Sequence, residues 1–121
     1  MTEGYLDSLW SQAIRARKGE FCCNPGCPNP AGGVHHIIKR RYKVLRWDAR
    51  NGIPLCSICH PIADRNSAWA LSLISAADRK YLEQMGVYVL QDWLKINGLT
   101  RDEFMQQKAD ECKAIIKARL A

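Results

Sequence analysis

The stretch 21–64 reads FCCNPGCPNPAGGVHHIIKRRYKVLRWDARNGIPLCSICHPIAD, and it contains two cysteine pairs that decide the fold. Each pair is close in sequence: Cys22 or Cys23 with Cys27, and Cys56 with Cys59. The segment around the first pair is so rich in Pro, Gly and Asn that it forms no regular helix or strand, and it needs a cross-link to hold its shape. Zinc prefers four sulfur or imidazole ligands in a tetrahedron. The sequence therefore predicts one structural zinc site, with free thiols or two disulfides as the alternatives.

Between the cysteine pairs the sequence predicts a β-hairpin. VHHII at 34–38 is rich in β-branched residues, and residues 53–56 supply a partner strand. Asn51-Gly52 is a strong turn signal directly before the second strand. Pro61 suits the first turn of a helix, because its missing N–H has no partner there anyway. We expect this helix to run from Pro61 into the early seventies, with a break near Asn66.

Helical periodicity dominates the rest of the chain. We expect helices at three places: Tyr5 to Lys18, Ala76 to Met85, and from the Thr100–Glu103 capping box to Leu120. Residues 87–96 fit either a strand or a helix. The last helix carries one apolar stripe: Met105, Ala109, Cys112, Ile116 and Leu120. This stripe fits packing on the domain or on a second copy of the chain.

These elements predict a single domain over residues 1–121, of the α+β class and mostly helical. Its core, at about 20–73, holds the hairpin, the zinc site and one helix. An N-terminal helix and a C-terminal helical extension, at about 75–121, flank that core. A chain of 121 residues buries only a modest apolar core, so we expect a metal, a disulfide or a partner to add to its stability.

The net charge of +6 is concentrated in one segment. Six cations, opposed there only by Asp48, lie close together: Lys39, Arg40, Arg41, Lys43, Arg46 and Arg50. Such an excess attracts nucleic acid, although a solvated basic face without a partner is the plain alternative. The sequence has no apolar run of membrane-spanning length and no signal-peptide pattern at residues 1–20, so we expect an intracellular protein that does not enter a membrane.

All three histidines of the chain lie beside the expected hairpin and zinc site, at His35, His36 and His60. A single histidine is usually a satisfied structural residue. Here zinc-pinned closure of the cysteine pairs would bring the three together with the turn residue Asn51. The four residues are therefore a candidate site.

HHII and NGIPLCSICH, framed by cysteine pairs, resemble the HNH endonucleases, and phage-associated members of that family most of all. The spacing agrees with the family: fifteen positions from His36 to Asn51, nine from there to His60, and four from His60 to Asp64. The resemblance covers Cys22 to Asp64 and fades beyond Trp69. It implies a ββα-metal (HNH, His-Me finger) core, in which a hairpin and one helix hold a single catalytic divalent ion.

The resemblance also implies a role for each residue of the candidate site. His35 and His60 would be metal ligands, His36 the general base, and Asn51 the residue that orients the base and its loop. At Asp64 the family often has a third histidine; a carboxylate there suits an oxygen-preferring ion, and a solvated Asp64 is the alternative. The implied zinc ligands are Cys22, Cys27, Cys56 and Cys59, because the outer cysteine of the Cys22-Cys23 pair serves in similar members.

The expected function is metal-dependent hydrolysis of DNA phosphodiester bonds that nicks one strand, with Mn or Mg as the catalytic ion and Ni or Zn as alternatives. The expected contacts to the DNA backbone are Lys39, Arg40, Arg41, Lys43 and Arg46. The expected protein is a monomer or weak homodimer, cytoplasmic, and bacterial or phage-encoded. Two other classes remain open: a non-catalytic zinc module that binds nucleic acid, and a protein-interaction adaptor built on a zinc ribbon.

Overall fold

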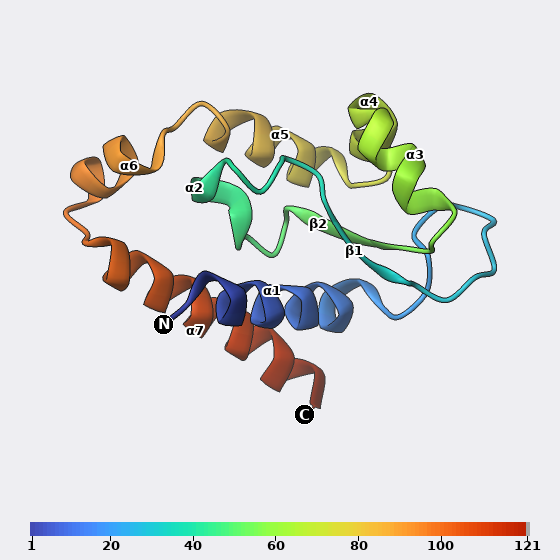
Figure 1. Ribbon diagram of the computed structural model, residues 1–121, viewed down its shortest axis with the longest axis horizontal. Helices are drawn as coiled ribbons and strands as arrows, with labels where there is room; N and C mark the ends of the chain where they lie inside the picture. The colour runs from blue at the N-terminus through green and yellow to red at the C-terminus, as the bar shows by residue number, and fades with distance from the viewer. Residues whose placement is uncertain (121) are drawn as a thin grey trace.

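The computed structural model describes residues 1–120 and shows an α+β chain that is mostly helical (Figure 1). The elements in order are α1 (Glu3–Lys18), β1 (Gly33–His36), α2 (Lys43–Arg46), β2 (Gly52–Leu55), α3 (Cys59–Arg65), α4 (Ser67–Ser72), α5 (Ala76–Met85), α6 (Leu90–Asn97) and α7 (Arg101–Leu120).

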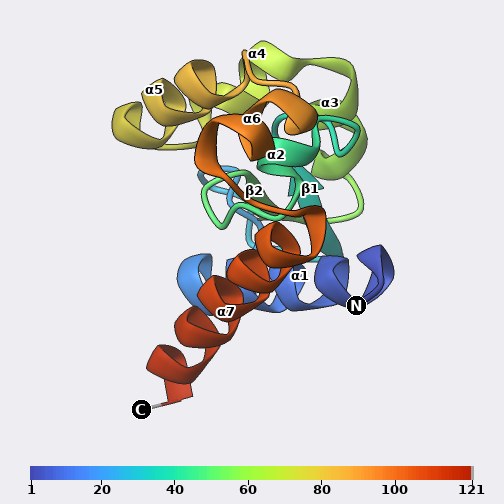
Figure 2. The same ribbon diagram turned by 90° about the vertical axis from the view of Figure 1, so that its left-hand side faces the viewer.

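The two strands form an antiparallel hairpin in the middle of the molecule. His36 pairs with Gly52 at one end of the hairpin, and Gly33 pairs with Leu55 at the other. In Figure 1 the hairpin lies between α1 and α7 below it and α3, α4 and α5 above it. Figure 2 shows that α7 crosses α1 obliquely rather than running along it.

The layers bury two separate apolar clusters, one on each side of the hairpin. The upper cluster joins the hairpin to α3, α4 and α5, with Ile53, Leu55 and Leu82 fully buried. The lower cluster joins α1 to α7, with Leu6 and Phe104 at its centre. Because the hairpin contributes to the upper cluster and rests on α1 below, its position is constrained from both sides.

Helix α1 approaches β2 closely enough to require a glycine there. A Cβ atom built on Gly52 would lie 2.5 Å from Cζ2 of Trp10 and 2.9 Å from two side-chain atoms of Ile14. No real Cβ tolerates contacts that short, so the glycine of the Asn51-Gly52 pair serves this close packing. The pair therefore has a second role that the turn signal alone does not indicate.

Most expected elements are present with small shifts in their bounds. Residues 87–96, which fit a strand or a helix, form most of helix α6. The expected break near Asn66 separates α3 from α4, because the Asn66 side chain accepts a hydrogen bond from the N–H of Trp69 and caps the second helix. The capping residues Ser75 and Thr100 accept hydrogen bonds from the backbone N–H groups of Asp78 and Glu103.

Three expectations about elements need correction. The first strand ends at His36 and not at Ile38, because the chain turns where Asn51 bonds to both backbone groups of Ile38. The connection between the strands is not a plain loop but contains the short helix α2. The helix after the second cysteine pair begins at Cys59, two residues before Pro61.

The apolar stripe of the last helix packs within the domain. Met105, Ala109 and Cys112 are buried against α1, whereas Leu120 is 83% exposed. The stripe is therefore largely used by the domain's own core. Within residues 1–120, no helix has both the length and the apolar character needed to cross a membrane.

Candidate metal centres and basic surface

The four sulfur atoms of Cys22, Cys27, Cys56 and Cys59 lie within 4.8 Å of one another. The sulfurs of Cys27 and Cys56 are 3.9 Å apart, which is far longer than a disulfide bond. Zinc–sulfur bonds of about 2.3 Å in a tetrahedron place neighbouring sulfurs about 3.8 Å apart. The cluster therefore fits one zinc ion and confirms that these cysteines are gathered at one point.

Hydrogen bonds from N–H groups to the sulfurs of Cys56 and Cys59 stabilise the thiolate form that a metal requires, although burial and the neighbouring thiols raise the pKa of Cys59 and Cys27. The backbone N–H of Cys59 donates to the sulfur of Cys56 at 3.4 Å and lowers the pKa of Cys56 to about 6. The Asn24 side-chain amide donates to Cys59 at 3.4 Å. Cys23 is not part of the cluster, and its backbone N–H donates to the carbonyl of Pro54.

A second group of possible metal ligands contains His35, His60 and Asp64, with one ligand atom of each within 4.8 Å of the others. Nδ1 of His35 lies 3.2 Å from Oδ1 of Asp64, and Nε2 of His60 lies 3.8 Å from the same oxygen. His35 comes from β1, whereas His60 and Asp64 lie one turn apart on α3. The hairpin and the helix thus bring two imidazoles and a carboxylate to one point.

The two groups differ in how far they are open to solvent. The sulfur cluster is largely buried, whereas the side chains of His35, His60 and Asp64 are 9%, 34% and 61% exposed. A hollow of about 320 Å³ adjoins His60 and Asp64, with Gly32 and Ser57 in its walls. A cation bound here would keep coordination positions open to water or substrate, as a catalytic metal site requires and a structural one does not.

The expectation that all three histidines come together needs correction, because His35 and His60 meet but His36 does not join them. Neighbouring residues of a strand point to opposite faces, so His36 faces away from His35. Its ring stacks on the indole of Trp10, with ring centres 3.8 Å apart and planes 8° from parallel. Its Nε2 lies 2.9 Å from the carbonyl oxygen of Arg46. Since a carbonyl only accepts, Nε2 carries the hydrogen and Nδ1 keeps its lone pair. Burial lowers the pKa of His36 to about 4, so the ring is neutral near pH 7.

Asn51 is fully buried and holds the connection between the strands in place. Its Oδ1 accepts a hydrogen bond from the N–H of Ile38 at 2.7 Å. Its Nδ2 donates to the carbonyls of Ile38 at 3.0 Å and Leu45 at 2.9 Å. The segment between the two strands, residues 37–51, carries the basic residues and is called the basic connection below. The Asn51 side chain holds the start of this connection, and α2 within it, next to β2.

The expected basic surface is smaller than the sequence indicates. Arg46 is 7% exposed, and its Nη2 lies 2.8 Å from Oδ2 of Asp7 on α1, so it is not placed to contact a DNA backbone. Lys43 pairs with Glu3 at 2.9 Å. Arg40 remains exposed although it approaches Asp7 at 3.5 Å. In the described part of the chain no ion pair involves Lys39 or Arg41, and both are exposed.

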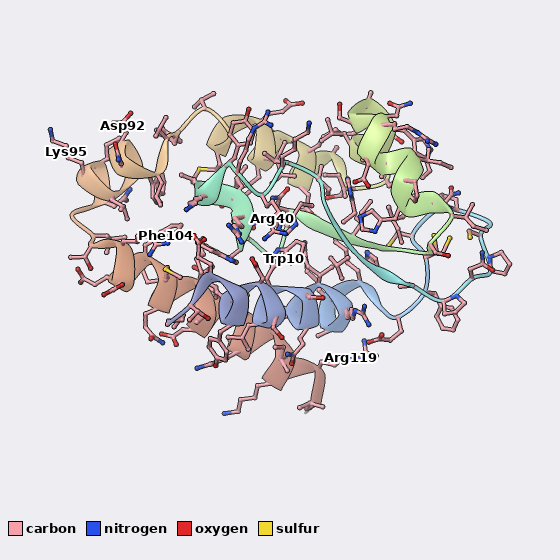
Figure 3. All side chains as sticks on the ribbon, in the orientation of Figure 1. Trp10, Arg40, Asp92, Lys95, Phe104 and Arg119 are labelled. Atoms are coloured by element: carbon pink, nitrogen blue, oxygen red, sulfur yellow. The ribbon has the colours of Figure 1, made fainter. Side chains whose placement is uncertain are left out.

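The sequence reasoning missed two residues of this site, Asp7 and Trp10. Asp7 accepts from Nε of Arg46 and from Nε1 of Trp47 at 2.8 Å, and so anchors the segment whose carbonyl meets His36. Trp10 stacks on His36 and points from α1 toward the hairpin (Figure 3). The two residues are three apart on one helix face. An acidic residue beside the apolar face of a helix is the signal that could have indicated Asp7.

No family model matches this chain, and neither a curated protein nor a solved structure matches it.

Proposed function

We propose that the protein is a metal-dependent DNA endonuclease of the HNH kind, which hydrolyses phosphodiester bonds and nicks one strand. The observation that carries the proposal is the open group of His35, His60 and Asp64 beside a largely buried four-sulfur cluster. The closed sulfur cluster fits a structural metal site, and the accessible site with nitrogen and oxygen ligands fits a catalytic metal site. The exposed cations of the connection between the strands supply the attraction for a polyanion.

The open site fits a divalent cation by its donor chemistry. Burial lowers the pKa of His35, which keeps its ring neutral and able to bind a metal. The carboxylate of Asp64 adds the oxygen ligand that Mn and Mg prefer. Such an ion, when bound, would stabilise negative charge on the phosphate and on the leaving oxygen. His35, His60 and Asp64 are thus the proposed ligands of the catalytic ion.

His36 is the proposed general base. An in-line attack on phosphorus comes from the side opposite to the leaving oxygen, so a general base that acts on the water and an ion that stabilises the leaving oxygen would lie on different sides of the phosphate. The ring is neutral and its Nε2 hydrogen is bound to a carbonyl, so Nδ1 has the lone pair that can take the proton of the attacking water. With its pKa lowered to about 4, His36 is a weaker base than a free imidazole. Trp10 and the Arg46 carbonyl hold the ring in that orientation, and Asn51 holds the connection that carries the carbonyl.

A second candidate function is a non-catalytic zinc module that binds nucleic acid. The position of His36 favours it, because the ring stacks on Trp10 and does not join the group of His35, His60 and Asp64, as expected of a structural histidine. The two functions share the sulfur cluster and the exposed cations. They differ in whether His36 and the open site are required for cleavage.

The test is incubation of supercoiled plasmid with the protein and Mg, Mn, Ni or Zn, beside the variant His36→Ala. We expect relaxed circles only with added metal, and at least about 100-fold slower nicking by the variant, as is typical when a general base is removed. Zinc content, thermal melting and a gel shift on the same samples check that the variant folds and binds DNA.

Equal nicking by the parent and the variant would overturn the role of His36. No nicking with any of the four metals, together with a normal gel shift, would instead support the non-catalytic module.

A further inference from the structure

A cavity of about 660 Å³ lies away from both metal centres, and the proposed cleavage does not use it. One wall comes from the basic connection between the strands, with Arg41 and Tyr42, and the other from the link between α5 and α6, with Val87 and Tyr88. Its volume falls within the range of pockets that hold small organic groups. The cavity is thus large enough for a nucleobase with its sugar.

The walls of the cavity are apolar and aromatic although water reaches them. Val87 is 76% exposed, Val89 61%, Tyr42 43% and Tyr88 37%. Tyr88 is braced by Trp93 of α6, with ring centres 5.0 Å apart. Exposed apolar side chains that gather around one hollow suit a ligand that covers them. Two accessible tyrosine rings suit a flat, apolar ligand in particular.

The charge at the rim indicates that this ligand is an anion. The guanidinium of Arg41 lies over the ring of Tyr42 at 5.0 Å and contacts its hydroxyl at 3.3 Å. No carboxylate in the described range 1–120 forms an ion pair with it. Lys43 and Arg101 also line the cavity, although both share Glu3. A nucleotide combines these two features, because the flat face of its base stacks on aromatic rings and its phosphate carries a negative charge.

The cavity and the proposed cleavage site lie toward opposite ends of the molecule and are joined by the basic connection. Helices α2 and α6 lie toward one end of the long axis, whereas α3, with His60 and Asp64, lies toward the other (Figure 1). The basic connection joins these regions and contributes Arg41 and Tyr42 to the cavity. A strand cut at the open site could therefore continue along the exposed cations to the cavity.

We propose that this cavity binds an unpaired base of single-stranded DNA by stacking on Tyr42 and Tyr88, with Arg41 on the adjacent phosphate. The inference rests on the proposed function for the identity of the ligand, and it narrows the substrate to DNA with a single-stranded segment near the cut. A base inside an intact duplex is stacked and paired and does not reach such a pocket without being extruded.

The test measures binding without added catalytic metal, so that it is independent of cleavage. A fluorescent single-stranded oligonucleotide and the matching duplex are titrated with the zinc-loaded protein and with the variants Tyr42→Ala and Tyr88→Ala. Tyr5→Ala is the matched control, since Tyr5 is an exposed tyrosine that does not line the cavity. We expect each cavity variant to bind the single strand about 5- to 100-fold more weakly and to bind the duplex unchanged.

Loss of Tyr88 also removes its contact with Trp93 and could disturb α6, so a further variant leaves that contact intact. Val87→Asp changes a side chain that is 76% exposed and adds a negative charge beside the cavity. We expect it to melt like the parent and to weaken single-strand binding by a similar factor.

Cavity variants that bind the single strand as tightly as Tyr5→Ala does would overturn the inference. Tyr88-dependent binding of an acidic, tryptophan-containing peptide without such binding of DNA would also overturn it, in favour of a protein partner. Failure of plasmid nicking with intact Tyr88-dependent DNA binding would count against the proposed function alone.

Discussion

At the scale of single residues, the strongest constraint on the candidate site is the buried amide of Asn51. It hydrogen-bonds to the N–H and carbonyl of Ile38 and to the carbonyl of Leu45, and so holds the connection next to β2. A buried polar group left without a partner costs about 1–3 kcal/mol.

We therefore expect Asn51→Ala to lower the free energy of unfolding by about 3 kcal/mol, measured by urea denaturation. Asn97→Ala is the matched control, because Asn97 is an exposed asparagine bonded only to a carbonyl of its own helix. Its change should stay within about 0.5 kcal/mol. Equal effects of the two substitutions would show that Asn51 does not hold the connection.

Asp48 gives a residue-scale prediction about pH. Burial alone would raise its pKa, but the hydroxyl of Tyr81 at 2.7 Å, together with Lys108 and Arg50, lowers the pKa below its ordinary 3.8. A carboxylate with a lowered folded pKa adds stability that is complete above its unfolded pKa and is lost as pH falls through the folded one. We expect the parent to lose more unfolding free energy below about pH 4 than Asp48→Asn does. Parallel pH profiles in urea denaturation would contradict this.

At the scale of elements, the sequence indicated which helices exist but not which faces meet. The caps at Ser75 and Thr100 are local signals, since a side chain bonds to a backbone N–H three residues away. The contact of α1 with β2 and the ion pair between Asp7 and Arg46 join segments far apart in the chain. No local pattern specifies such contacts, which is why Arg46 was expected to be a DNA contact.

The contact between α1 and β2 gives a prediction at this scale. Gly52→Ala would place a methyl group 2.5 Å from the ring of Trp10, so we expect a loss of about 2 kcal/mol in the free energy of unfolding. Gly4→Ala is the control, because nothing lies within 4 Å of the added methyl group in α1. It should be neutral or stabilising by up to about 1 kcal/mol. A Gly52→Ala variant as stable as the parent would mean that α1 does not approach β2 this closely.

At the scale of the whole molecule, the sulfur cluster connects the irregular segment after α1 to the hairpin and α3. A zinc site made by two cysteine pairs could be predicted from sequence because pair spacing reports ligand geometry, but the spacing allowed either Cys22 or Cys23 as the fourth ligand. The choice of Cys22 over Cys23 followed only from a resemblance, and the structure supports it. The sequence analysis named His35, His60 and Asp64 together as possible metal ligands, but it did not predict that Trp10 of α1 stacks on His36.

Zinc removal tests the role of the cluster in the whole fold. We expect Cys22→Ser to lose bound zinc and to melt at a markedly lower temperature, because the segment it anchors has little apolar core of its own. Cys23→Ser should keep one zinc per chain and melt like the parent, since Cys23 is outside the cluster. The measurements are metal analysis and thermal melting. If Cys23→Ser lost zinc and melted earlier while Cys22→Ser did not, Cys23 and not Cys22 would be the zinc ligand.

The most direct measurement of the central claim is an anomalous-scattering map of a crystal of the zinc-loaded protein soaked in Mn²⁺. We expect one manganese peak bonded to His35, His60 and Asp64 at about 2.0–2.3 Å, separate from the zinc peak among the four sulfurs. A crystal in which manganese occupies no position between the two imidazoles and the carboxylate, with those residues accessible to solvent, would contradict the assignment of a catalytic metal centre.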